Sequence, residues 1–221
     1  MAAVETTTDA TPAIHETALG ETGLPGELLP LHASGPRAFG WWGMAWLIGT
    51  EATLFALLIA TYFYLRSQSG PAWPPDRIPD PELRLPLVMT VILWSSSIPV
   101  HLADQGIRAG DVGRLKAGLA AGFALGATFL VLTLAVEWPD AHDEFGPTTN
   151  AYGSLFFTIT GFHAAHVLVG LLISLWVQVR VWQAAFDRSR HLSVQNFATY
   201  WHFVDIVWAF VLATVYLSPH L

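Results

Sequence analysis

The chain has 221 residues, of which 53% are hydrophobic and 12% are charged, whereas about a quarter of a soluble domain is charged. It contains no cysteine, which excludes disulfides and thiolate-bound metals, and its net charge of −7 argues against nucleic acid as a partner. These quantities indicate a membrane protein in which any metal would be held by histidines and carboxylates.

Residues 1–38 differ in composition from the rest of the chain. They are rich in Thr, Ala, Glu, Pro and Gly, and no basic residue precedes Arg37. The segment lacks the basic start and apolar core of a signal peptide. We expect an acidic tail that is disordered or loosely docked, followed by a membrane domain over residues 39–221.

Five segments of that domain are long and apolar enough to cross a bilayer as helices, which takes about 20 residues each. They lie at about 40–65, 85–107, 115–136, 151–179 and 197–217. The connection 67–82 holds five prolines and cannot continue a helix, and the acidic connection 137–150 is expected to be a loop. The predicted fold is an all-α bundle of five transmembrane helices.

The ten lysines and arginines predict the orientation of this bundle. Seven of them fall on one side of the predicted membrane, namely Arg37, Arg108, Arg114, Lys116, Arg180, Arg188 and Arg190. Three fall on the other side, namely Arg66, Arg77 and Arg84. Because cytoplasmic loops carry the excess of positive charge, we expect the N-terminus and its tail in the cytoplasm and the C-terminus outside.

The third predicted span contains glycines at every fourth position. Gly118, Gly122 and Gly126 form a GxxxGxxxG row on one helix face. Without side chains in the way, another helix can approach such a row closely. The row predicts tight helix packing along this span.

Six ionisable side chains fall inside the predicted spans: Glu51, His101, His163, His166, His202 and Asp205. Each is unfavourable in hydrocarbon, so each is expected to be buried against protein with a partner. With a rise of about 1.5 Å per residue, all six fall at similar depth, nearer the cytoplasmic side. His163 and His166 lie three residues apart in GFHAAHVLVG and share a helix face. We therefore predict one buried polar layer.

Three functions for this layer remain open from the residues alone. The histidines could hold haem between facing helices, as in a membrane cytochrome b. Glu51 and Asp205 could carry protons in a proton path or a coupled transporter. The layer could also be structural, with carboxylate–imidazole hydrogen bonds that fix helix packing. The sequence contains no P-loop, dinucleotide fingerprint, HExxH or nucleophile elbow, so no catalytic residue is assigned.

Long motifs in the last two spans carry a family resemblance. They read YGSLFFTITGFHAAHVLVG at 152–170 and YWHFVDIVWAFVLATVYL at 200–217. Weaker agreement comes from GTEATLFALLIATYFYLR at 49–66 and SSSIPVHLADQGIRAGD at 95–111. From about residue 39 to 217 the sequence resembles subunit III of the haem–copper terminal oxidases, in the five-helix bacterial form.

The resemblance implies a non-catalytic subunit of a proton-pumping oxidase of aerobic respiration, in the bacterial plasma membrane. Cytochrome c oxidase is the expected type. The family carries its haems and copper in subunits I and II, which implies no cofactor or metal in this chain. The chain is then expected to pack directly on subunit I, with subunit II in the same complex. It would support proton uptake and bind membrane phospholipid.

The resemblance also implies roles for individual residues. Glu51 matches a reactive buried carboxylate of the family, so we expect it to pair with His163 or His166. The resemblance also counts against haem ligation by these histidines or by His202. Arg180 matches a basic position near phospholipid headgroups, although a generic interfacial anchor explains it equally well. Alternatives are a quinol oxidase subunit III, the accessory paralogue of bacterial nitric oxide reductases and, from a different class, a membrane cytochrome b.

Overall fold

The computed structural model describes residues 38–69, 73–74, 82–183 and 191–220, all helical or in connections. The predicted tail lies outside these ranges except for Ala38. Five helices in them are long and apolar enough to cross a membrane, which confirms the prediction. They are α1 (Phe39–Ser69), α2 (Arg84–Ala109), α3 with its extensions (Val112–Glu144), α5 (Ala151–Trp182) and α6 with its extensions (Leu192–His220).

The third span is longer than predicted, because residues 137–144 continue the helix. α3 proper (Val112–Leu132) leads through a π-helical segment, η3 (Thr133–Glu137), into α4 (Trp138–Glu144). Pro139 lacks an N–H, and its ring would clash with a carbonyl of the preceding α-helical turn. The wider π-helical turn before it shifts the hydrogen-bond pattern, so that the Trp138 N–H bonds to the Thr133 carbonyl. The predicted loop is therefore shorter.

The last span repeats this arrangement. α6 proper (Leu192–Val211) continues through a second π-helical segment, η4 (Leu212–Leu217), into a short 3₁₀ turn, η5 (Ser218–His220). The Ser218 N–H bonds to the Ala213 carbonyl, and Pro219 follows directly. A proline thus follows both π-helical segments. Because proline has no N–H to donate, the wider turn before it lets the helix continue without the regular hydrogen bond at that position.

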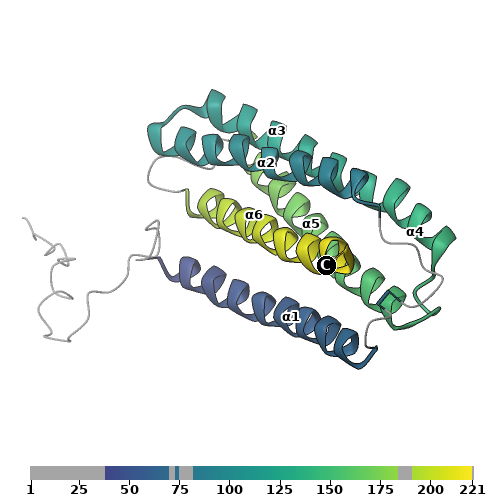
Figure 1. The fold of residues 1–221 in the computed structure, drawn as a ribbon. Coiled ribbons are helices and arrows are strands. Elements are labelled where there is room, and N and C mark those ends of the chain that lie inside the picture. Colours follow the sequence, from purple (N-terminus) through teal and green to yellow (C-terminus); the bar gives the residue numbers. More distant parts are fainter. Residues whose placement is uncertain (1–37, 70–72, 75–81, 184–190, 221) are drawn as a thin grey trace, which may run out of the picture.

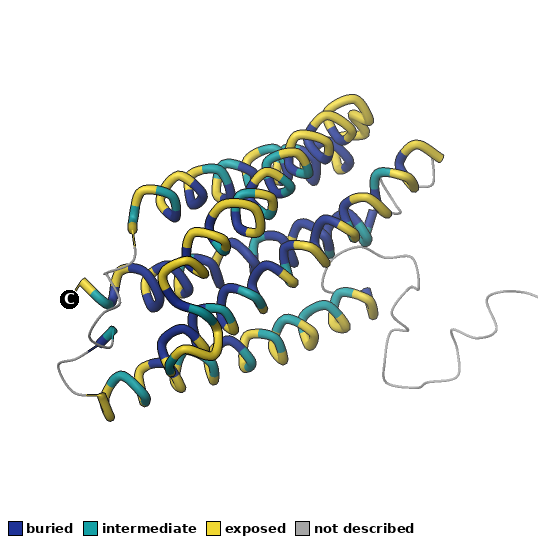
Figure 2. Tube along the Cα trace, turned by 90° about the vertical axis from the view of Figure 1, so that its right-hand side faces the viewer, coloured by how far each residue is buried: buried dark blue, intermediate teal, exposed yellow. Residues whose placement is uncertain are grey.

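The helices pack around α6. Figure 1 shows α2 and α3 side by side, α5 and α6 below them, and α1 on the far side of α6. α6 contacts α1, α2 and α5 and carries much of the core, including Trp201 and Trp208. α1 buries only Phe55 and Tyr62 within this chain and is exposed or half-buried along its length (Figure 2). One helix is thus attached to the outside of a four-helix core.

The glycine row of α3 lies against neighbouring helices, as predicted. A Cβ at Gly118 would lie 2.4 Å from the Pro99 carbonyl oxygen of α2. A Cβ at Gly126 would lie 2.5 Å from the ring of Trp201 on α6. The glycines therefore allow backbone-to-backbone packing with α2 and make room for a large aromatic ring of α6.

The end of α1 is fastened by a small group of hydrogen bonds. Tyr62 is fully buried; its hydroxyl accepts a hydrogen bond from Trp73 Nε1 at 3.0 Å and lies within hydrogen-bond distance of Ser218 Oγ at 3.2 Å. Trp73 belongs to the connection after α1, and Ser218 to the last turn of the chain. We call these three residues the Tyr62 clasp.

The two ends of the bundle differ in charge. The basic end contains the start of α1, the turn between α2 and α3, the end of α5 and the start of α6 (Figure 1). Its described cations are Arg108, Arg114, Lys116 and Arg180. The opposite, acidic end carries Glu82, Glu137, Asp140, Asp143 and Glu144.

Candidate functional site

The six ionisable groups predicted to form one layer divide into two clusters. Glu51 of α1 and His166 of α5 make one contact across a helix interface. His202 and Asp205 of α6 make another with α2. The remaining two, His163 and His101, make no hydrogen bond to either carboxylate in the described structure and occupy very different surroundings.

Glu51 pairs with His166 and not with His163. Glu51 Oε2 lies 3.0 Å from His166 Nε2, and the other ring nitrogen lies 2.7 Å from the Phe162 carbonyl oxygen. Because a carbonyl only accepts, Nδ1 carries a hydrogen. Nε2 then either accepts the proton of a neutral Glu51 or donates a second ring proton to its carboxylate. One proton is thus shared between the two side chains.

Glu51 is less buried than the sequence led us to expect. Its side chain is 30% exposed, and that of His166 is 13% exposed. The reason is the position of α1, whose outer face no other described helix of this chain covers (Figure 2). The pair is therefore open to lipid or to a partner on one side.

His163 occupies the interior of the bundle. It is 1% exposed, and its ring lies 4.9 Å from the ring of Trp208 and 5.7 Å from that of Phe129 between centroids. Within the described part of the chain, neither ring nitrogen has a hydrogen-bond partner. The imidazole is thus enclosed by aromatic rings, and helix packing is the role that its contacts support.

The second cluster centres on a serine that the sequence reasoning missed. Ser97 Oγ of α2 lies 2.9 Å from His202 Nδ1 and donates a hydrogen bond to the carboxylate of Asp205. A hydroxyl has one hydrogen, so a donor to Asp205 must accept from His202. Ser97 lies one helical turn before His101 in SSSIPVH, and this spacing was the available signal.

His101 continues this cluster toward the basic end. Its ring centroid lies 6.5 Å from that of His202, and its Nε2 lies 2.9 Å from Gln105 Nε2. Against expectation His101 is exposed, because it lies on a face of α2 that no described helix covers. Next to it Asp104 and Arg108 form an ion pair at 2.8 Å.

A polar pocket of about 290 Å³ opens beside these groups at the basic end. It is lined by Trp41, His101, Asp104, Arg108, Gln195, Ala198, Thr199 and His202. The described structure therefore joins the surface of the basic end to the buried Asp205 through His202 and Ser97. We call Asp205, Ser97, His202 and His101 the polar chain.

Comparison with known proteins places this bundle in a family. A protein-family model described as "Cytochrome c oxidase subunit III" matches residues 31–219, which include all five helices. A cytochrome c oxidase subunit 3 from Synechocystis is 38% identical over 201 residues, covering 90% of this chain and 83% of that protein. The chain belongs to the cytochrome c oxidase subunit III family. The subunit 3 of Thermostichus vulcanus is 31% identical over 185 residues, with 79% of this chain and 85% of that protein covered.

The match extends to larger members of the subunit III family. The Drosophila melanogaster protein is 33% identical over 180 residues, which cover 79% of this chain but 68% of that protein. These relatives are subunits of cytochrome c oxidase, so this chain is part of an oxidase complex. Across the part of this chain that the structure describes, no three His, Asp or Glu side chains are grouped to hold a metal ion.

Arg180 lies at the basic end of α5. Its guanidinium is 5.8 Å from the ring centroid of Trp176, and both side chains are exposed. A cation beside an aromatic ring at a helix end is typical of the membrane–water interface. The geometry suits contact with a lipid headgroup.

Proposed function

We propose that this chain is subunit III of a proton-pumping cytochrome c oxidase and packs on subunit I, with subunit II in the same complex. Haems and copper lie in those partner subunits, and this chain sustains proton uptake from the cytoplasm. The observation that carries the proposal is the polar chain, which leads from the polar pocket to the buried carboxylate of Asp205 at the contact between α2 and α6.

The charge distribution supports the orientation that this function needs. The described cations of the basic end, together with the positive-inside rule, support a cytoplasmic position for that end. The N-terminus is then cytoplasmic and the C-terminus outside, in a bacterial plasma membrane. The polar pocket opens on the side from which an oxidase takes its protons.

The polar chain is suited to collecting protons. An imidazole can both donate and accept a hydrogen bond through its two ring nitrogens, and His101 is exposed at the mouth of the polar pocket. His202, Ser97 and Asp205 form a continuous set of exchangeable hydrogens behind it. Groups that hold protons at the opening of the polar pocket raise the local proton concentration beside the adjoining subunit.

The face that carries the polar chain also suits packing against another membrane subunit. Large apolar side chains surround it, including the exposed Trp94 and Ile98 of α2 and the exposed Ile206 of α6. Polar groups at membrane depth are tolerated where protein or a cavity covers them. Subunit I is the expected cover.

Bound phospholipid is the second part of the proposal. An apolar pocket of about 480 Å³ lies between α1 and α6, with Phe55, Ile59 and Phe210 in its lining. An acyl chain fits such a lining, and Arg180 beside Trp176 would hold a headgroup at the cytoplasmic surface.

The test is purification of the complex with Asp205→Asn, with His142→Gln as the control. His142 is an exposed histidine of the acidic end, far along the bundle from the polar chain. We expect Asp205→Asn to slow proton uptake during turnover while haem and copper content stay constant, and His142→Gln to change neither. Purification of the wild-type chain without haem–copper subunits would overturn the proposal.

A further inference from the structure

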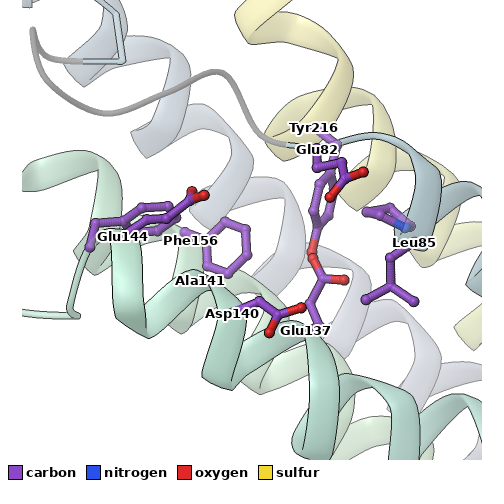
Figure 3. Close-up of a pocket in the computed structure, with 10 residues that line it drawn as sticks. Glu82, Leu85, Glu137, Asp140, Ala141, Glu144, Phe156 and Tyr216 are labelled. Carbon is purple, nitrogen blue, oxygen red and sulfur yellow. The ribbon is translucent and has the colours of Figure 1, made fainter.

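The acidic end contains a pocket that the proposed function does not use. It has a volume of about 80 Å³ and lies between the start of α2, α4 and the last turns of the chain (Figure 3). Its lining comprises Glu82, Leu85, Pro86, Glu137, Asp140, Ala141, Glu144, Phe145, Phe156 and Tyr216. We call it the acidic pocket.

Glu137 is the buried carboxylate of this pocket. It is 7% exposed, and the Tyr216 hydroxyl, which points at its carboxylate in Figure 3, donates a hydrogen bond to it. Its Oε2 atom is buried and has no hydrogen-bond partner among the residues that the structure describes. A buried carboxyl oxygen without a partner is unfavourable whether or not the group is charged, so the arrangement leaves room for a donor that is outside the described residues.

Both residues of this hydrogen bond lie in π-helical segments. Glu137 ends η3, and Tyr216 lies in η4. π-helical turns occur preferentially at functional sites, because they redirect side chains that a regular helix would place elsewhere. The two segments together bring a carboxylate and a phenol to one point.

The acidic side chains around Glu137 favour binding of a cation in this pocket. Asp140 and Glu144 of α4 and Glu82 before α2 line the same pocket, and Tyr216 is the polar group that faces it from η4. Arg84, a described cation of this end, is exposed and lies 4.0 Å from Glu82. Four carboxylates thus line one small pocket.

The apolar walls of the acidic pocket indicate which kind of cation fits. No three of the described carboxylates are grouped closely enough to ligate a metal ion directly. Leu85, Phe145 and Phe156 supply apolar surface next to the acidic groups. Lysine and arginine combine an apolar stem with a cationic head, so their side chains match both features.

We propose that the acidic pocket receives a lysine or arginine side chain from a neighbouring subunit of the oxidase. The stem lies along Phe145 and Phe156, and the cation pairs with Glu137 Oε2. The inference rests on the proposed place of this chain in the complex, and it adds an anchor at the outer end of the bundle.

The experiment compares Glu137→Gln with Asp143→Asn in the purified wild-type and variant complexes. Asp143 is an exposed carboxylate of the same helix that does not line the pocket, so its variant matches the change in charge. The ratio of this chain to subunit I is measured after washes of increasing salt. Removing one partner of a buried charge pair should weaken retention of the chain roughly 30-fold. Asp143→Asn and Glu137→Asp, which keeps the charge, should behave like the wild type.

Folding is checked separately by expressing each full chain alone and comparing its elution and yield in detergent. Equal retention of Glu137→Gln and wild type would overturn the inference, and so would weaker retention accompanied by misfolding of the lone chain. If Arg77→Gln weakened retention as Glu137→Gln does, the cation would come from this chain itself, which also overturns it. Loss of the wild-type chain from the complex would instead count against the proposed function.

Discussion

Glu51 of α1 and His166 of α5 share one proton across a 3.0 Å contact. This contact joins the most exposed helix of the bundle to its core, and no other acid–base pair in the described residues does so. Since Nδ1 of His166 is committed to the Phe162 carbonyl, the orientation of the imidazole is fixed. The pair therefore joins α1 to α5 through a hydrogen bond of fixed orientation.

Glu51→Gln should leave this link weakened but present, because an amide can still donate to or accept from His166 Nε2. We expect the free energy of unfolding to fall by about 0.6–2 kcal/mol, which is the range for interhelical polar bonds in membranes. Haem and copper content per complex should not change. Metal analysis with thermal denaturation checks this, and a fall in haem in proportion to activity would contradict it.

The two neighbouring histidines should respond differently to phenylalanine. His163→Phe replaces a ring with two unpaired nitrogens by an apolar ring in an aromatic site, so stability should change by less than about 1.5 kcal/mol. His166→Phe leaves the Glu51 carboxyl without its partner and should lower stability by about 1–3 kcal/mol. Thermal unfolding of both purified variants gives the comparison, and a reversed order would contradict the assignment.

Ser97→Ala should interrupt the polar chain. Asp205 then loses its hydroxyl donor and His202 its acceptor, at about 1–3 kcal/mol of stability. Proton uptake, followed with a pH dye during a single turnover, should slow. Ser95→Ala is the matched control, because among the described residues Ser95 Oγ bonds to the Ile92 carbonyl of its own helix and not to the polar chain. Equal uptake in both variants would remove Ser97 from the path.

Gly118→Ala should destabilise the bundle by about 1–3 kcal/mol, since its Cβ would meet the Pro99 carbonyl at 2.4 Å. Backbone cannot move aside as a flexible side chain can. Gly43→Ala on α1 is the control, because nothing lies within 4 Å of the added atom. Unfolding in detergent should show that Gly118→Ala is clearly less stable than Gly43→Ala. Equal stability of the two variants would mean that α2 and α3 pack less closely.

Much of this architecture could be predicted from hydrophobicity and spacing alone. Five apolar segments gave five helices, and the glycines of α3 marked its packing face. The continuation past Glu137 could not be predicted, since proline at 139 is normally a helix stop and a π-helical turn has no simple sequence signature.

The site was predictable in residue type but not in grouping. Depth along the helices placed Glu51, His166, His202 and Asp205 at one level, yet depth carries no information about rotation around the bundle axis. The bundle separates the pairs by helix face and leaves His101 exposed. Ser97 was missed because serine is common in membrane helices, where its hydroxyl usually bonds to its own backbone.

The Tyr62 clasp has a consequence for the order in which the helices become attached. Ser218 lies 156 residues after Tyr62, so α1 is synthesised well before this partner exists. Until Ser218 is made, α1 has only part of its attachment to the bundle. Loss of the Ser218 hydroxyl should therefore loosen the end of α1 while all five spans stay inserted. The short turn after α6 thus fastens a helix that enters the bilayer much earlier.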